Sequence, residues 1–145
     1  SIPTYALPLR ALALAFARVG TGSGLPPDVA TAAARLRRAV AKAPFMVGGT
    51  DRFDTQVMQA LGERLCCKVG AEGVYCASLP ELGLGLALKI EDGASRAAEA
   101  LMAEIALQLL RPSGETATLL HRLAAPVLHN WRGTEVGRLR VRLGH

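Results

Sequence analysis

The stretch RLCCKVGAEGVYCASLPE, residues 64–81, marks the point at which the spacing of apolar residues changes from helical to alternating. Leu65, Cys67 and Val69 alternate with residues that include Lys68. A period of two is typical of a β-strand and places Lys68 on the face opposite to its apolar neighbours. Residues 73–78 and 83–90 predict two more strands. Because the connections between the three are short, we expect an antiparallel meander.

The segments before this stretch predict three helices, over residues 7–19, 28–43 and from about residue 51 to 65. We expect Gly20 to end the first helix and Pro44 to end the second. Thr50 or Asp51 is placed to cap the third. The region 1–64 is therefore predicted to be mostly helical.

Beyond the meander, residues 65–145 are predicted to mix strands and helices. The large residues of the third strand share one face and need a helix to cover them, and residues 93–111 carry a long apolar stripe that fits this role. A shorter helix is expected over residues 115–124, and Val136–Leu143 predict a terminal strand. The fold class is α/β of the α+β type: a helical segment, antiparallel strands and a packed C-terminal helix, either as a single domain or as the C-terminal portion of a larger one.

Composition excludes several classes of protein. Half of the 145 residues are hydrophobic and 20% are charged, as in a packed domain rather than a disordered chain. The net charge is +5, but aromatic residues make up only 4%, so we expect no nucleic-acid binding. Charges interrupt every apolar run, so we expect no membrane span. Because the chain starts at Ser1 without a methionine, we expect a processed product or a piece of a longer protein.

Cysteine and histidine spacing predicts neither a disulfide framework nor a complete metal site. The three cysteines are an odd number, and no Cys-x-x-Cys or closely spaced histidine pair accompanies them. We therefore expect no cofactor, although a zinc site completed by residues outside this chain stays open. Free thiols favour a cytoplasmic location. We expect the three thiols to be buried as small apolar groups, with a reactive Cys66 as the alternative.

The segment KVGAEGVYCASLPELGLGLALKIEDGASRAAE, residues 68–99, closely resembles the bacterial asparaginase II family. PTYALPLRALALAFA (3–17), VGGTDRFDTQVMQA (47–60) and LHNWRGTEVGRL (128–139) resemble it as well, so the resemblance covers nearly the whole chain. It implies a fold similar to that of serine β-lactamases and glutaminases. Members of the family are about twice as long, and their Ser-x-x-Lys nucleophile segment precedes the region that this chain resembles.

The resemblance implies hydrolysis of L-asparagine to L-aspartate and ammonia through a serine nucleophile and an acyl-enzyme. Lys68 then corresponds to the lysine of the Lys-Thr-Gly strand of serine β-lactamases, and Gly70 leaves room for substrate at the strand edge. Glu72 is a candidate for binding the α-ammonium group and Arg52 for binding the α-carboxylate, with Thr50 beside it. The implied partners are L-asparagine, an N-terminal half or partner chain that carries the nucleophile, and further copies of the same chain.

Other interpretations remain open for the same residues. Glu72 and Arg52 are also compatible with ordinary exposed charges, and Thr50 with a helix cap alone. The whole chain is compatible with a non-catalytic half that binds a partner. A third alternative is an N-terminal-nucleophile hydrolase, in which Ser1 attacks the substrate and its own amine acts as base.

Overall fold

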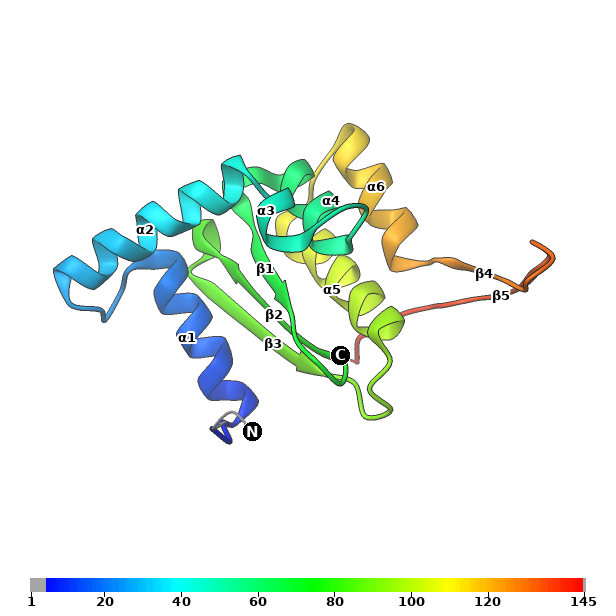
Figure 1. The fold of residues 1–145 in the computed structure, drawn as a ribbon, viewed down its shortest axis with the longest axis horizontal. Coiled ribbons are helices and arrows are strands. Elements are labelled where there is room, and N and C mark those ends of the chain that lie inside the picture. Colours follow the sequence, from blue (N-terminus) through cyan, green and yellow to red (C-terminus); the bar gives the residue numbers. More distant parts are fainter. Residues whose placement is uncertain (1–4, 145) are drawn as a thin grey trace.

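The computed structural model describes residues 5–144 and confirms the α+β class (Figure 1). Within these residues there are six α-helices and two small antiparallel sheets. In chain order the elements are α1 (Leu9–Thr21), α2 (Pro27–Lys42), α3 (Phe45–Gly48), α4 (Phe53–Leu61), β1 (Cys66–Val69), β2 (Val74–Leu79), β3 (Leu84–Lys89), α5 (Ser95–Leu110), α6 (Gly114–Ala124), β4 (Val127–His129) and β5 (Glu135–Arg138).

The predicted meander is confirmed. The larger sheet has the order β1-β2-β3, and both pairs of strands are antiparallel. Lys68 pairs with Cys76, which in turn pairs with Ala87 on β3, so these three side chains share one face. Five of the six residues of β2 are buried, because helices cover this central strand on both faces.

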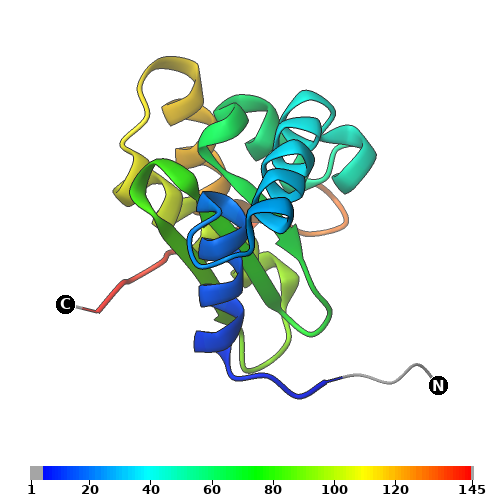
Figure 2. The ribbon, with the colours of Figure 1, turned by 90° about the vertical axis from the view of Figure 1, so that its left-hand side faces the viewer.

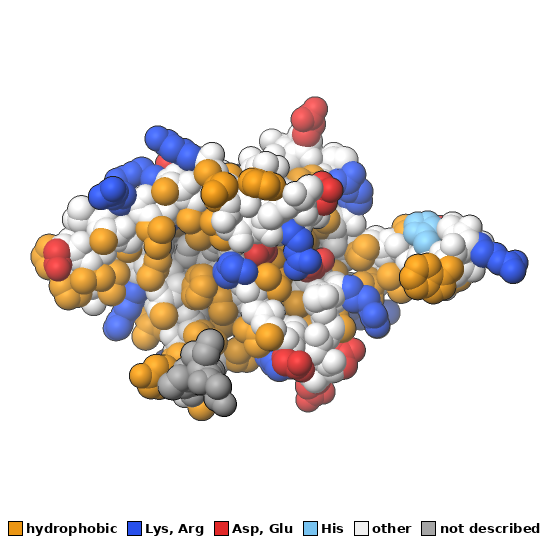
Figure 3. All heavy atoms as spheres, in the orientation of Figure 1, with side chains coloured by type: hydrophobic (Ala, Val, Ile, Leu, Met, Phe, Trp, Pro, Cys, Tyr) orange, Lys and Arg blue, Asp and Glu red, His pale blue; other side chains and the backbone are white. Residues whose placement is uncertain are grey.

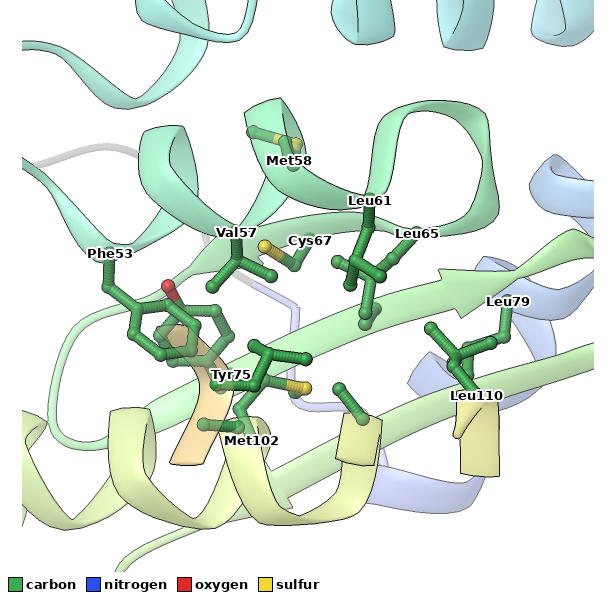
Figure 4. Packing of buried hydrophobic residues seen from close by; sticks show 14 of the residues in the cluster. Phe53, Val57, Met58, Leu61, Leu65, Cys67, Tyr75, Leu79, Met102 and Leu110 are labelled. Carbon is green, nitrogen blue, oxygen red and sulfur yellow. The ribbon is translucent and has the colours of Figure 1, made fainter. Parts of the chain in front are cut away.

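The main core lies on the face of the sheet that carries the larger side chains. Val57 and Met58 of α4, Cys67 and Tyr75 of the sheet and Met102 of α5 are at most 1% exposed (Figure 4). The rings of Phe53 and Tyr75 meet edge to face, with centroids 5.5 Å apart. The predicted helix over residues 93–111 is confirmed as part of this layer, because α5 places Met102 and three of its alanines in the core.

The opposite face of the sheet is covered by α1, which the sequence patterns did not predict. Figures 1 and 2 show α1 lying across β2 and β3. The helix approaches closely because glycines face it: a Cβ on Gly85 would overlap the carbonyl oxygen of Ala13 and the backbone nitrogen of Ala17. In the same contact, a Cβ on Gly20 would lie 2.9 Å from Cβ of Ser78. Small residues therefore join α1 to the sheet.

The prediction that Gly20 ends the first helix is wrong. Gly20 is buried inside α1, and the helix continues to Thr21 before Gly22 adopts a φ of 78°. The physical reason is the close contact with Ser78, which requires a residue without a side chain at position 20. The apolar arc of α1 is also only partly buried, since the Leu9 and Leu14 residues are 41% and 51% exposed.

The predicted cap of the third helix is also wrong. α4 begins at Phe53 with Arg52 at the N-cap position, and neither Thr50 nor Asp51 bonds to its first turn through a side chain. Asp51 instead adopts a φ of 55° in the turn before the helix, and its carbonyl oxygen accepts a bond from Gln56 Nε2 at 3.1 Å. The short helix α3 fills the segment that leads into this turn.

The predicted terminal strand is shorter than expected. Only Glu135–Arg138 is a strand, and it pairs with β4 in a hairpin that projects from the body of the protein (Figure 1). Residues 139–144 form no regular element. The hairpin turn is built by Asn130, whose side-chain oxygen accepts bonds from the backbone N–H groups of Arg132 and Thr134 at 2.9 and 3.0 Å.

Candidate active site

The strand that carries Lys68 has one free edge, because β1 is the outer strand of its sheet. Gly70 N–H donates to Val74 O at 2.8 Å, which directs the polar groups of Val69 away from β2. The Val69 N–H donates instead to Asp54 Oδ2 at 3.3 Å, and the Val69 carbonyl accepts a bond from Lys68 Nζ at 3.1 Å. The backbone N–H and carbonyl of Val69 are thus each hydrogen-bonded to a charged side chain, the first to Asp54 and the second to Lys68.

Asp54 is the buried member of this arrangement. Its side chain is 2% exposed, and Oδ2 lies 3.8 Å from Lys68 Nζ, whose side chain is 51% exposed. Asp54 sits in the first turn of α4, where a carboxylate is favoured by the helix dipole. The segment before α4 packs tightly on this turn, since a Cβ on Gly48 would lie 3.0 Å from Cβ of Asp54. In addition, Thr55 Oγ1 donates to Gly49 O at 2.7 Å.

Burial is the main influence on the acidity of this site. It raises the pKa of Asp54, against the opposing effects of the Val69 N–H, Lys68, Arg52 and the Cys67 thiol. Burial also raises the pKa of Glu99 on α5, where the charge of Arg52 opposes the shift and that of Asp54 adds to it. We call Arg52, Asp54, Lys68 and Glu99 the β1-edge cluster. It holds two carboxylates and two cations.

The structure brings together two of the predicted site residues. Lys68 and Arg52 both act on the Asp54 carboxylate and so belong to one electrostatic cluster. Glu72 lies in the turn after β1 with a φ of 57°, packed against the Gly93 loop, and Gly70 is exposed beside it. Thr50 is exposed in the turn before α4. Within residues 5–144, no hydrogen bond or ion pair joins Glu72 or Thr50 to Lys68.

Asp54 and Glu99 were missed by reasoning from the sequence, although a signal for Asp54 was present. Asp54 stands three and four residues before Val57 and Met58, so it lies on the apolar side of its helix. A carboxylate at a core-facing position is rarely left without a partner. Glu99 gives no such signal, because its neighbourhood depends on how α5 packs against α4 and β2.

The cysteines do not have the properties of a nucleophile. Cys67 and Cys76 are buried and Cys66 is half-buried. Burial raises the pKa of all three thiols, most of all that of Cys67, which disfavours the reactive thiolate. The alternative nucleophile Ser1 lies outside the described residues.

Two further properties concern metals and membranes. The part of the chain that the structure describes, residues 5–144, contains no group of three or more metal-ligating side chains. Over the same residues, none of the helices combines the length and the apolar composition that crossing a bilayer requires.

A testable consequence of the buried carboxylate is an unusual effect of Asp54→Asn on stability. Because the pKa of Asp54 is raised in the folded state, its ionised form carries a cost of burial that the amide lacks. We expect the free energy of unfolding of the Asn variant to equal or exceed that of the wild type at pH 7. This difference in the free energy of unfolding should shrink as the pH falls below the raised pKa of Asp54 in the folded protein. It should be gone near about pH 4, the ordinary pKa range of aspartate.

Urea unfolding of both proteins at a series of pH values measures this gap. Asp51→Asn, an exposed carboxylate in the turn before the same helix, is the matched control. If the wild type were instead more stable at pH 7 and lost that advantage in acid, the ionised carboxylate would be stabilising and the assigned direction would be wrong.

The β1-edge cluster presents both signs of charge within one small region. Such a region suits a zwitterion, because an α-carboxylate needs a cation and an α-ammonium group needs an acid. A half-exposed lysine on a free strand edge also places a positive charge where a reacting group can approach.

Comparison with known proteins agrees with this chemistry. No curated protein matched the chain. The family model for L-asparaginase II matches residues 1–141, which include every residue of the β1-edge cluster. On this match over most of its length, the chain belongs to the L-asparaginase II family.

Proposed function

We propose that this chain provides the lysine-bearing side of an active site that hydrolyses L-asparagine to L-aspartate and ammonia. The observation that carries the proposal is the position of Lys68, held at the free edge of β1 by a buried carboxylate in a chain of the L-asparaginase II family. A solvated strand lysine does not need such a partner. The cost of burying Asp54 indicates a role that stability alone does not explain.

In the proposed reaction, a serine oxygen attacks the carbon of the side-chain amide and ammonia leaves. Water then hydrolyses the resulting ester, releasing L-aspartate and restoring the serine. As the family resemblance implies, the nucleophile would be provided by a Ser-x-x-Lys segment outside this chain. Burial raises the pKa of the three thiols of this chain, which makes them poor candidates for that role. The positive charge of Lys68 favours the deprotonated form of a neighbouring basic group and stabilises negative charge in the transition state.

The remaining members of the β1-edge cluster are proposed to position the substrate. Arg52, at the start of α4, is the candidate for binding the α-carboxylate. Glu99 and Asp54 both lie near enough to Arg52 for its charge to lower their pKa against the larger effect of burial, and they offer an acid for the α-ammonium group. Glu72 is a second candidate for that acid, since its turn follows β1 directly. The free thiols support a cytoplasmic setting for this enzyme.

Ammonia release tests the proposed function. The 145-residue chain alone should release no ammonia from L-asparagine above the buffer rate, because it lacks the proposed nucleophile. A longer protein in which a Ser-x-x-Lys segment precedes this chain should release it. Coupled measurement of ammonia with L-asparagine and L-glutamine as substrates gives both the activity and the preference.

Two results would contradict the proposal in different ways. Turnover by the 145-residue chain that disappears in Ser1→Ala or Cys66→Ala would place the nucleophile within this chain. A longer protein with the Ser-x-x-Lys segment that releases no ammonia from either amide would favour the non-catalytic, partner-binding alternative.

A further inference from the structure

Helix α2 carries an apolar stripe that the rest of residues 5–144 leaves uncovered. None of its residues is buried. The stripe, which we call the α2 seam, has apolar residues at alternating intervals of three and four, namely Val29, Ala32, Leu36 and Ala39 in the helix and Ala43 at its C-cap. All five are exposed, with Val29 at 44% and Leu36 at 62%. This spacing is that of the contact positions in paired helices.

The position of the seam leaves room for a second helix. α2 rests on the rest of the protein through a different side, which carries half-buried Ala33, Arg37 and Val40. With half-buried Ala30, Ala34 and Ala41 included, the centre of that side is turned by about 120° from the seam at about 100° per residue. Figures 1 and 2 show α2 at the periphery of the molecule, and Figure 3 shows apolar side chains along it.

The charges beside the seam indicate which partner fits. Asp28, Arg35 and Lys42 follow one another at intervals of seven residues along one flank of the seam. Within residues 5–144, none of the three takes part in an ion pair. The acid is at the start of the helix and the lysine at its end. A second α2 running antiparallel would bring Asp28 of each copy to Lys42 of the other. In a parallel pair this flank would instead face Ala33 and Val40 of the partner helix, so the charges would not pair.

We propose that the α2 seam is a dimer interface, in which α2 packs antiparallel against α2 of a second copy across a two-fold axis. The two copies use the same surface, as a two-fold interface requires. Arg35 falls near the axis and meets Arg35 of the second copy, so its long side chain must extend into solvent. Because α2 has only 16 residues, about 24 Å of helix, the contact is smaller than a standard interface and the dimer should be weak.

The first test measures association of the 145-residue chain by sedimentation over a range of micromolar concentrations. We expect a concentration-dependent dimer that Leu36→Glu weakens by about tenfold or more, because the charge would be buried at the centre of the seam. Val136→Glu is the matched control: Val136 is 63% exposed, close to the value for Leu36, but lies on β5. It should leave the dissociation constant unchanged. A circular dichroism melt shows that each variant is folded.

The second test is charge reversal, which specifies the antiparallel arrangement. Asp28→Lys and Lys42→Asp should each weaken the dimer several-fold, and the double variant should restore it, because the pairing is exchanged rather than lost. A monomeric wild type at all concentrations would overturn the proposal. So would a dimer unaffected by Leu36→Glu, or single charge variants whose effects simply add. These measurements do not involve catalysis, so their outcome is independent of the proposed asparaginase activity.

Discussion

Replacing Gly85 with valine should destabilise the protein by about 3 kcal/mol or more, the largest effect on stability that we expect from a single substitution. A side chain at this position would overlap the carbonyl oxygen of Ala13 and the backbone nitrogen of Ala17. Both atoms belong to the backbone of α1, so no change of rotamer can relieve the overlap. The helix would have to move away from the sheet and expose the face of β2 and β3 that it covers.

Gly137→Val is the matched control for this prediction. Gly137 is also a strand glycine, but the nearest atom to an added Cβ is Cδ1 of Leu128 at 4.0 Å. Valine is favoured in strands, so this variant should be as stable as the wild type or slightly more stable. Urea unfolding of the two variants gives the comparison. Equal stability of the Gly85 and Gly137 variants would mean that α1 does not pack on the sheet in solution as described.

Lys68→Met should lower kcat/KM for L-asparagine by about 100-fold or more in the active protein, which is about 2.7 kcal/mol of transition-state stabilisation. Methionine keeps much of the length of the side chain and removes the charge. The fold should survive, because the Lys68 side chain is half exposed and the Val69 N–H still donates to Asp54. If Lys68 were only a solvated strand residue, the change should cost about 0.5 kcal/mol of stability or less and leave turnover intact.

Lys89→Met provides a closely matched control. Lys89 is also an exposed strand lysine whose ammonium bonds to the carbonyl of the following residue, Ile90, as that of Lys68 bonds to Val69. What distinguishes Lys68 is the Asp54 carboxylate at 3.8 Å. We therefore expect Lys89→Met to retain full activity. Near-wild-type turnover in Lys68→Met, or equal losses in both variants, would remove Lys68 from the proposed site.

The local patterns of the sequence determined most of the secondary structure. The alternation from Leu65 predicted β1 and the exposed position of Lys68, since neighbouring residues of a strand point to opposite faces whatever covers them. The short connections likewise determined the antiparallel order β1-β2-β3, because a parallel crossover needs a longer segment. The helix formers of α2 favour a helix through their own backbone preferences, and Pro44 limits how far that helix can extend. Both effects are local and can be predicted from the sequence.

Only the tertiary structure decided which helix covers which face of the sheet, and with it the composition of the β1-edge cluster. Gly20 and Gly85 are 65 positions apart in sequence, and each is needed for one contact between α1 and the sheet. From local patterns alone, Gly20 is predicted to end a helix and Gly85 to be a weak position in a strand. Asp54 and Lys68 meet because α4 lies along the free edge of β1, where a buried carboxylate can reach an unpaired N–H. Propensity and periodicity act over a few neighbouring residues, whereas burial and charge depend on all the residues that packing brings together.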